Sequence, residues 1–181
     1  MAKRIIWSLG IDPSLTGTGI VQIRGDDPRA MWVDGAYDVV LSECISTPAK
    51  TPLLSRCETI VSVIEGILAA APSSMHITIE DWTTSRFSVL QLVPLQTLVR
   101  HAIWKQGREF KLLTPTALKN VATGDGGAKK KAMKLAAAQR FGFETKNDNL
   151  ADAFLLSMLG ATTGHDIVPS QKHAVSLLRS W

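Results

Sequence analysis

Three carboxylate side chains lie at positions from which an active site can be built. Asp12 follows the apolar, β-rich segment Arg4–Ile11, Glu80 ends the short segment His76–Glu80, and Asp152 lies near the start of an apolar helical segment. Strand ends of an α/β sheet meet in a crevice at its carboxyl edge, so we expect the three carboxylates to lie close together. Carboxylates crowded there repel one another, and their hard oxygen atoms favour Mg²⁺ or Mn²⁺ as neutralising ions. Two such ions about 4 Å apart can activate a water molecule and stabilise the leaving oxygen of a phosphodiester.

Two more polar residues precede the last of these carboxylates. Asp148 and Asn149 lie four and three positions before Asp152, so they can share its face of a helix. A carboxylate binds Mg²⁺ better than an amide, which favours Asp148 over Asn149 as a fourth ligand. The sequence leaves this choice open.

Each carboxylate also has a purely structural interpretation. Asp12 precedes a proline and is a good turn former, Asp148 is a good helix N-cap, and Glu80 can pair with a nearby base such as Arg86. Asp152 is harder to explain in this way, because it is followed by the apolar run AFLLSML, where an unpaired charge is costly. The ordered set on strand, strand and helix therefore favours a functional site.

The basic residues are concentrated in one part of the chain. The segment Arg100–Arg140 contains ten Lys or Arg residues and two acids, a local balance of +8, whereas the net charge of the whole chain is +4. The rest of the chain therefore carries a balance of −4. A cationic surface of this kind suits a polyanion, because lysine and arginine displace counterions from phosphates. A solvated helical face explains the charge equally well.

The elements that must position these side chains alternate between strands and helices. Apolar and β-branched runs bounded by turn residues predict strands over Arg4–Ile11, Thr18–Arg24, Tyr37–Cys44, His76–Glu80 and Phe110–Leu113. Helical spacing predicts helices over Leu53–Ala71, Ser88–Gln106, a short segment from Pro115, Ala128–Phe141 and Leu150–Leu159. Gly25–Pro28 is expected to be a turn, and Pro94 is expected to kink its helix or mark the first turn. Three hairpin strands followed by alternating helices and strands indicate a mixed five-stranded sheet flanked by helices, an α/β fold.

Composition excludes several classes of protein. No apolar run approaches the roughly 18 residues of a membrane span, and the N-terminal residues do not form the apolar core of a signal peptide. Cys44 and Cys57 are the only cysteines, with no CxxC pair, which argues against a disulfide framework or a zinc site. We therefore expect no membrane partner and a reducing, cytoplasmic location.

Four segments resemble the motifs of RuvC-type Holliday junction resolvases, which are members of the RNase H-like nuclease superfamily. They are GIDPSLTGTG (Gly10–Gly19), ITIEDW (Ile77–Trp82), LKNVATGDGGAKK (Leu118–Lys130) and ADAFLLSML (Ala151–Leu159), and they occur in family order. The chain departs from the family at two positions. Asn149 stands where the family places an acid or a histidine, and Trp82 is the nearest match to the family's aromatic residue after the second carboxylate.

The resemblance implies an enzyme, a site and partners. It implies a metal-dependent endonuclease that resolves four-way junctions and other branched DNA as a homodimer, with two Mg²⁺ ions per site, which Mn²⁺ can replace. The implied catalytic residues are Asp12, Glu80, Asp148, Asp152, Lys119 and Lys130, and the implied metal ligands are Asp12, Glu80, Asp148, Asn149 and Asp152. The implied DNA contacts are Trp82, Arg86, Lys119, Lys129, Lys130, Lys131 and Lys134. Residues 1–160 are expected to form the nuclease domain and residues 161–181 a tail with a short helix near Gln171–Leu178, in a bacterial or phage protein.

Two other functions compete with this one. The opening motif also resembles sugar kinases and actin-like ATPases, but those proteins resemble two duplicated domains of this kind and this chain has room for one. Gly124–Lys131 is rich in glycine and lysine without matching a P-loop. A non-catalytic DNA-binding module explains the basic segment but leaves the carboxylates unexplained.

Overall fold

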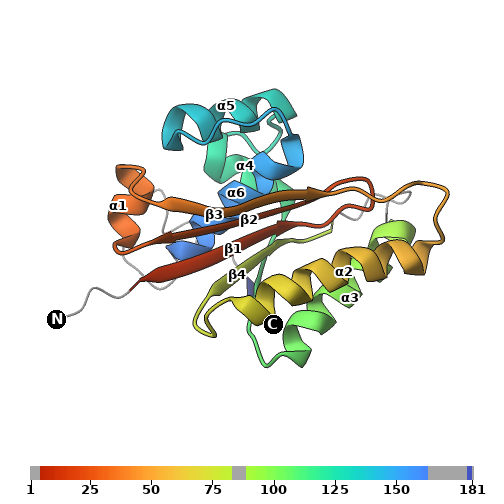
Figure 1. Ribbon diagram of the computed structural model, residues 1–181. Coiled ribbons are helices and arrows are strands. Elements are labelled where there is room, and N and C mark those ends of the chain that lie inside the picture. Colours follow the sequence, from red (N-terminus) through yellow and green to blue (C-terminus); the bar gives the residue numbers. More distant parts are fainter. Residues whose placement is uncertain (1–4, 83–88, 163–178, 181) are drawn as a thin grey trace.

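A mixed sheet is the centre of the molecule (Figure 1). The computed structural model describes residues 5–82, 89–162 and 179–180. The strands are β1 (Ile6–Asp12), β2 (Thr18–Gly25), β3 (Asp38–Ile45), β4 (His76–Glu80), β5 (Lys111–Leu113) and β6 (Arg179–Ser180), in the order β3-β2-β1-β4-β5-β6. β1 pairs in parallel with β4, and β4 with β5, whereas the other three pairs are antiparallel. The expected five strands are confirmed, and the two-residue β6 is added to them.

Helices cover both faces of this sheet. Their bounds are α1 (Pro28–Val33), α2 (Leu53–Ala70), α3 (Val89–Lys105), α4 (Pro115–Thr123), α5 (Lys130–Phe141) and α6 (Asp148–Ala161). α2 and α3 lie together on one face, and α4, α5 and α6 lie on the other (Figure 1). α6 is the helix that packs directly on β1, β2 and β4. No helix in the described part of the chain is long and apolar enough to cross a membrane.

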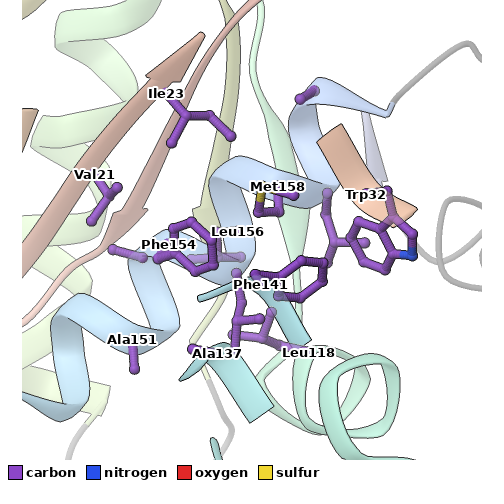
Figure 2. Close-up of a cluster of buried hydrophobic side chains, with 14 of the residues drawn as sticks. Val21, Ile23, Trp32, Leu118, Ala137, Phe141, Ala151, Phe154, Leu156 and Met158 are labelled. Carbon is purple, nitrogen blue, oxygen red and sulfur yellow. The ribbon is translucent and has the colours of Figure 1, made fainter. Parts of the chain in front are cut away.

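Two hydrophobic cores result from the period-two alternation of the strands. On β1, Leu9 and Ile11 are fully buried in the core shared with α2 and α3. The other core joins β2 to α1, α4, α5 and α6, and Figure 2 shows Phe154 of α6 and Phe141 of α5 at its centre. These two rings meet edge to face with centroids 5.8 Å apart. The α6 helix is therefore fixed by packing on both the sheet and α5.

Small residues let α6 approach the sheet closely. A side chain at Gly10 of β1 would place its Cβ 1.9 Å from the carbonyl oxygen of Ala153 in α6. At the other end of the contact, a Cβ on Gly160 would meet the hydroxyl oxygens of Ser8 and Thr78 at 2.5 and 2.6 Å. Backbone contact at Gly10 brings the first half of α6 against the carboxyl end of β1.

Two local details differ from the expectations. The expected turn at Gly25–Pro28 leads directly into α1, a helix that was not expected, because Asp27 accepts hydrogen bonds from the backbone N–H groups of Arg29 and Ala30 and so caps its start. Proline at the first helical position was the signal that this helix could begin there. Pro94 lies inside α3 rather than in its first turn. The expected helix at Gln171–Leu178 lies outside the described residues.

Candidate active site

The three predicted carboxylates come together at one end of the α6–sheet interface. Ile11 of β1 is paired in parallel with Ile79 of β4, so the next residues, Asp12 and Glu80, end neighbouring strands at the same level. Asp12 lies two residues after Gly10, and alternation points both toward α6. The side chains of Asp12 and Glu80 share a hydrogen bond, and both carboxylates interact electrostatically with Asp152 of α6. The sequence thus predicted the juxtaposition that the fold produces.

Burial makes all three carboxyl groups hard to ionise, and repulsion adds to this effect at Glu80 and Asp152. Burial raises the pKa of Asp12 from 3.8 to about 6, against the lowering effects of its hydrogen bond with Glu80 and of Lys130. Burial, followed by repulsion from Asp12 and Asp152, raises the pKa of Glu80 well above 4.5. Burial, followed by repulsion from Asp12 and Asp148, raises the pKa of Asp152 to about 7. The hydrogen bond between the first two carboxyl groups raises the pKa of Glu80 and lowers that of Asp12, so it favours the protonated form of Glu80 and the charged form of Asp12.

Two lysines, from α4 and α5, offset this negative charge. Lys119 of α4 lowers the pKa values of Glu80 and Asp152, and Lys130 of α5 lowers those of Asp12 and Asp152. Thr114 begins α4 as its N-cap, and a glycine-containing turn after Gly124 reverses the chain before α5. Both predicted lysines therefore lie near the carboxylates, and both act on Asp152.

Asp148 meets lysines rather than the hydrogen-bonded carboxyl pair. Its carboxylate is 2.7 Å from the ammonium of Lys134 and 3.3 Å from that of Lys130. The pKa of Asp148 is lowered, chiefly by its hydrogen bond with Lys134. Asp148 is the first residue of α6, and the expected N-cap role belongs to Asn147, whose side chain accepts from the backbone N–H groups of Asn149 and Leu150. The N-cap interpretation of Asp148 was wrong.

Asn149 connects α6 to the turn between β1 and β2. Its side-chain nitrogen donates a hydrogen bond to the carbonyl oxygen of Gly17. Its backbone lies so close to the next strand that a Cβ on Gly19 would be 2.2 Å from the Asn149 carbonyl oxygen. The amide therefore holds the loop that follows Asp12 against the helix that contains Asp152. The sequence pattern predicted Asn149 as a metal ligand and gave no sign of this contact.

A polar network that the sequence analysis missed supports the end of β4. Gln96 of α3 donates to the backbone carbonyl of Glu80, and Arg100 forms an ion pair of 2.8 Å with Asp81. The guanidinium of Arg100 lies 4.4 Å from the ring centroid of Trp82. The acid directly after Glu80, together with an arginine in the following helix, was the available signal. This network fixes the backbone of Glu80 and the ring of Trp82 from α3.

The other residues predicted to contact DNA lie at the start of α5, within α5, or outside the described residues. Lys129 and Lys131 are exposed at the start of α5, where Lys129 is the N-cap residue. Lys134 is bound to Asp148 and also donates to the carbonyl of Lys146. Arg86 lies outside the described residues.

The carboxylate oxygens of Asp12, Glu80 and Asp152 are chemically suited to bind a divalent cation. One carboxylate oxygen of Asp152, Oδ1, is buried with no hydrogen-bond partner, an arrangement that a cation would satisfy. Asp12 and Glu80 supply further hard oxygen atoms, of which one pair is bridged by a proton. As the side chains stand, no group of three His, Cys, Asp or Glu residues in the described ranges is arranged to hold a metal ion. Asp12, Glu80 and Asp152 are the residues that would hold such an ion.

This sheet order, with carboxylates at the ends of adjacent parallel strands and on the helix packed across them, is an RNase H-like fold. The family model that matches residues 8–159 is that of the crossover junction endodeoxyribonuclease RuvC, and the chain belongs to this family. Members of this family are metal-dependent nucleases that resolve DNA junctions.

Individual relatives agree with this assignment. The RuvC of Leifsonia xyli is 30% identical over 164 residues, which cover 86% of this chain and 74% of the relative. The RuvC of Neisseria meningitidis is 26% identical over 168 residues, covering 88% and 86%. Among solved structures, Thermus thermophilus RuvC matches with a TM-score of 0.72 at 17% identity, over 97% of this chain and 100% of that one. The same protein in complex with Holliday junction substrate matches with a TM-score of 0.70 at 15% identity, over 97% and 99%.

Proposed function

We propose that this chain resolves four-way DNA junctions by metal-dependent hydrolysis at Asp12, Glu80 and Asp152. The observation that supports the proposal most strongly is the convergence of these carboxyl groups, whose pKa values are all raised by burial, with repulsion between carboxylates adding to the rise at Glu80 and Asp152. A protein that bound DNA passively would gain nothing from burying three acids beside a cationic surface. Family membership supplies the reaction class, and the arrangement of side chains suits it.

The three carboxylates are the proposed metal ligands, with Mg²⁺ as the natural ion, two ions per site and Mn²⁺ as a substitute. A divalent ion bound there supplies the positive charge that activates water and stabilises the leaving oxygen. Asp12 and Glu80 would hold the ion in their deprotonated forms, and the unpartnered oxygen of Asp152 could coordinate it without losing any hydrogen bond. Asp148 contacts Lys130 and Lys134, and Asn149 donates to the carbonyl oxygen of Gly17, so neither is proposed as a fourth ligand.

The lysines are proposed to act on the phosphate that is cleaved. Lys119 and Lys130 flank the carboxylates from α4 and α5, where their charges stabilise the negative charge that develops on the phosphoryl oxygens. Lys129 and Lys131 extend this cationic surface along the start of α5 and are proposed to hold a DNA arm by its phosphates. Trp82, fixed by Arg100, is proposed to stack on a base near the cleaved strand.

The substrate explains the proposed assembly. A four-way junction has two equivalent strands to cut, and a two-fold homodimer presents one site to each of them. The exposed outer surfaces of α2 and α3 are the proposed contact between the two copies, and Trp104 of α3 is 69% exposed there. Residues 1–160 are proposed as the nuclease domain, acting in the cytoplasm of a bacterium or a phage-infected cell.

The direct test is incubation with a synthetic four-way junction and a matched linear duplex, with Mg²⁺ and with EDTA. We expect Mg²⁺-dependent cleavage of the junction and little cleavage of the duplex. Asp152→Asn is the matched inactive control, and a gel shift in EDTA checks that it still binds the junction. Junction binding without cleavage at any Mg²⁺ or Mn²⁺ concentration would favour a non-catalytic DNA-binding module instead.

A further inference from the structure

Helix α5 begins with positive charge in an unfavourable place. Lys129 is its N-cap and makes no side-chain capping bond, and Lys130 and Lys131 are its first two residues. The N-terminus of a helix has a partial positive charge, so cations there are unfavourable. The position of these lysines therefore does not stabilise α5. A lysine that is fixed there must be held by another side chain.

Asp148 is the group that holds one of them. Lys130 and Lys134 are one helical turn apart on α5, a spacing at which like charges repel. The carboxylate of Asp148 contacts both ammonium groups, at 3.3 Å from Lys130 and 2.7 Å from Lys134. Asp148 lies in the first turn of α6, where a negative charge is favourable. One carboxylate thus neutralises two cations and ties α5 to α6.

The two contacts differ in strength. The side chain of Lys134 is 30% exposed and also donates to the Lys146 carbonyl, which gives its ammonium two fixed acceptors. The side chain of Lys130 is 74% exposed and has the longer contact, and exposed ion pairs of this kind are weak. Lys134 therefore anchors Asp148, whereas Lys130 is held loosely enough to move onto a phosphate.

The loosely held lysine is the one that lies near the proposed reacting centre. Lys130 interacts electrostatically with both Asp12 and Asp152. We infer that Asp148 is a positioning residue that keeps Lys130 beside Asp12 and Asp152, with its own carboxylate fixed by Lys134. This inference rests on the proposed function, and it assigns Asp148 to the lysines and not to a metal ion.

Single-turnover cleavage, measured at saturating enzyme and junction, distinguishes a positioning role of Asp148 from a role as a metal ligand. Asp148→Asn and Lys134→Gln are each expected to lower the rate about tenfold, less than the roughly hundredfold that losing a transition-state contact costs, because Lys130 remains charged but is misplaced. The Mg²⁺ concentration for half-maximal rate should stay within about twofold of wild type, since no metal ligand is lost. Glu144→Gln and Lys50→Gln, exposed residues outside the site, are the charge-matched controls and should leave the rate unchanged.

Three outcomes would overturn the inference. One is a tenfold higher Mg²⁺ requirement for Asp148→Asn, which would make Asp148 a metal ligand. The other two are an unchanged cleavage rate in both variants and an equal loss of cleavage rate in the controls. Thermal melts in EDTA give a readout that is independent of cleavage. There the double variant Asp148→Asn/Lys134→Gln should melt close to the less stable single variant, and additive shifts would contradict the ion pair. If the wild-type protein does not cleave, the proposed function fails, and the melts alone still decide whether Asp148 and Lys134 are coupled.

Discussion

Asp152→Asn is expected to stabilise the metal-free protein at pH 8 while it abolishes metal-dependent cleavage. In the folded chain, burial and repulsion from Asp12 and Asp148 raise the pKa of Asp152 from 3.8 to about 7, so its charge opposes folding at pH 8. Asparagine keeps the size of the side chain and removes the charge. Stability and activity should therefore change in opposite directions.

The size of the effect follows from the pKa of Asp152. A change from 3.8 to about 7 corresponds to about 4 kcal/mol at about 1.4 kcal/mol per pKa unit. Because Asp12 and Glu80 adjust their own protonation when Asp152 ionises, the realised difference is smaller, and we expect about 2–4 kcal/mol. For a chain of 181 residues this is a rise in Tm of roughly 5–10 °C.

The change of stability with pH shows the sign of the contribution that Asp152 makes. The folded pKa lies above the unfolded value, so the contribution of Asp152 to stability is complete below about pH 4 and is lost as the pH rises through about 7. Thermal melts in EDTA at pH 5 and pH 8 should therefore show a gain for Asp152→Asn that is complete at pH 8 and less than half as large at pH 5. Mg²⁺ should raise the Tm of the wild type at pH 8 and have little effect on the variant. An equal gain at both pH values, or a loss at pH 8, would refute this account of the site.

Three further predictions test other parts of the structure. Asp12→Asn and Glu80→Gln should each abolish junction cleavage and leave gel-shift affinity intact or slightly higher, because a ligand charge is removed and the cationic surface is kept; near-normal cleavage by either would remove it from the site. Gly10→Ala should cost about 3 kcal/mol or more in chemical denaturation, because its Cβ would collide with the backbone of α6, whereas Gly66→Ala, at an exposed position of α2 with open space, should stabilise by about 0.5–1 kcal/mol. Arg108→Ala should cost about 1–3 kcal/mol in the same assay, because the guanidinium donates to three backbone carbonyls at the end of α2, and an unchanged midpoint would show that water replaces it fully.

Local sequence patterns were sufficient to predict the elements and the level at which the carboxylates lie. Alternating apolar residues that end in Asp12 and Glu80 predicted strands with those acids at their ends, and the observed pairing of β1 with β4 is parallel. Pattern is informative here because side-chain direction in a strand repeats every two residues. The same kind of local rule could have identified α1, since Asp27 followed by proline is a helix start, but the segment was interpreted as a turn.

Partners that are distant in the sequence were decided only by the tertiary structure. Asp148 and Asn149 are adjacent, and either was a plausible metal ligand from its spacing to Asp152, yet one contacts Lys130 and Lys134 and the other donates to Gly17. Side chains of adjacent helical residues point about 100° apart, so each meets whatever the fold brings to its own side. The raised pKa of Asp152 likewise depends on burial beneath neighbouring elements, a property that no local pattern encodes. The sequence by itself determined which residue types lie at the strand and helix ends, and the packing of α5 and α6 on the sheet decided which of them face one another.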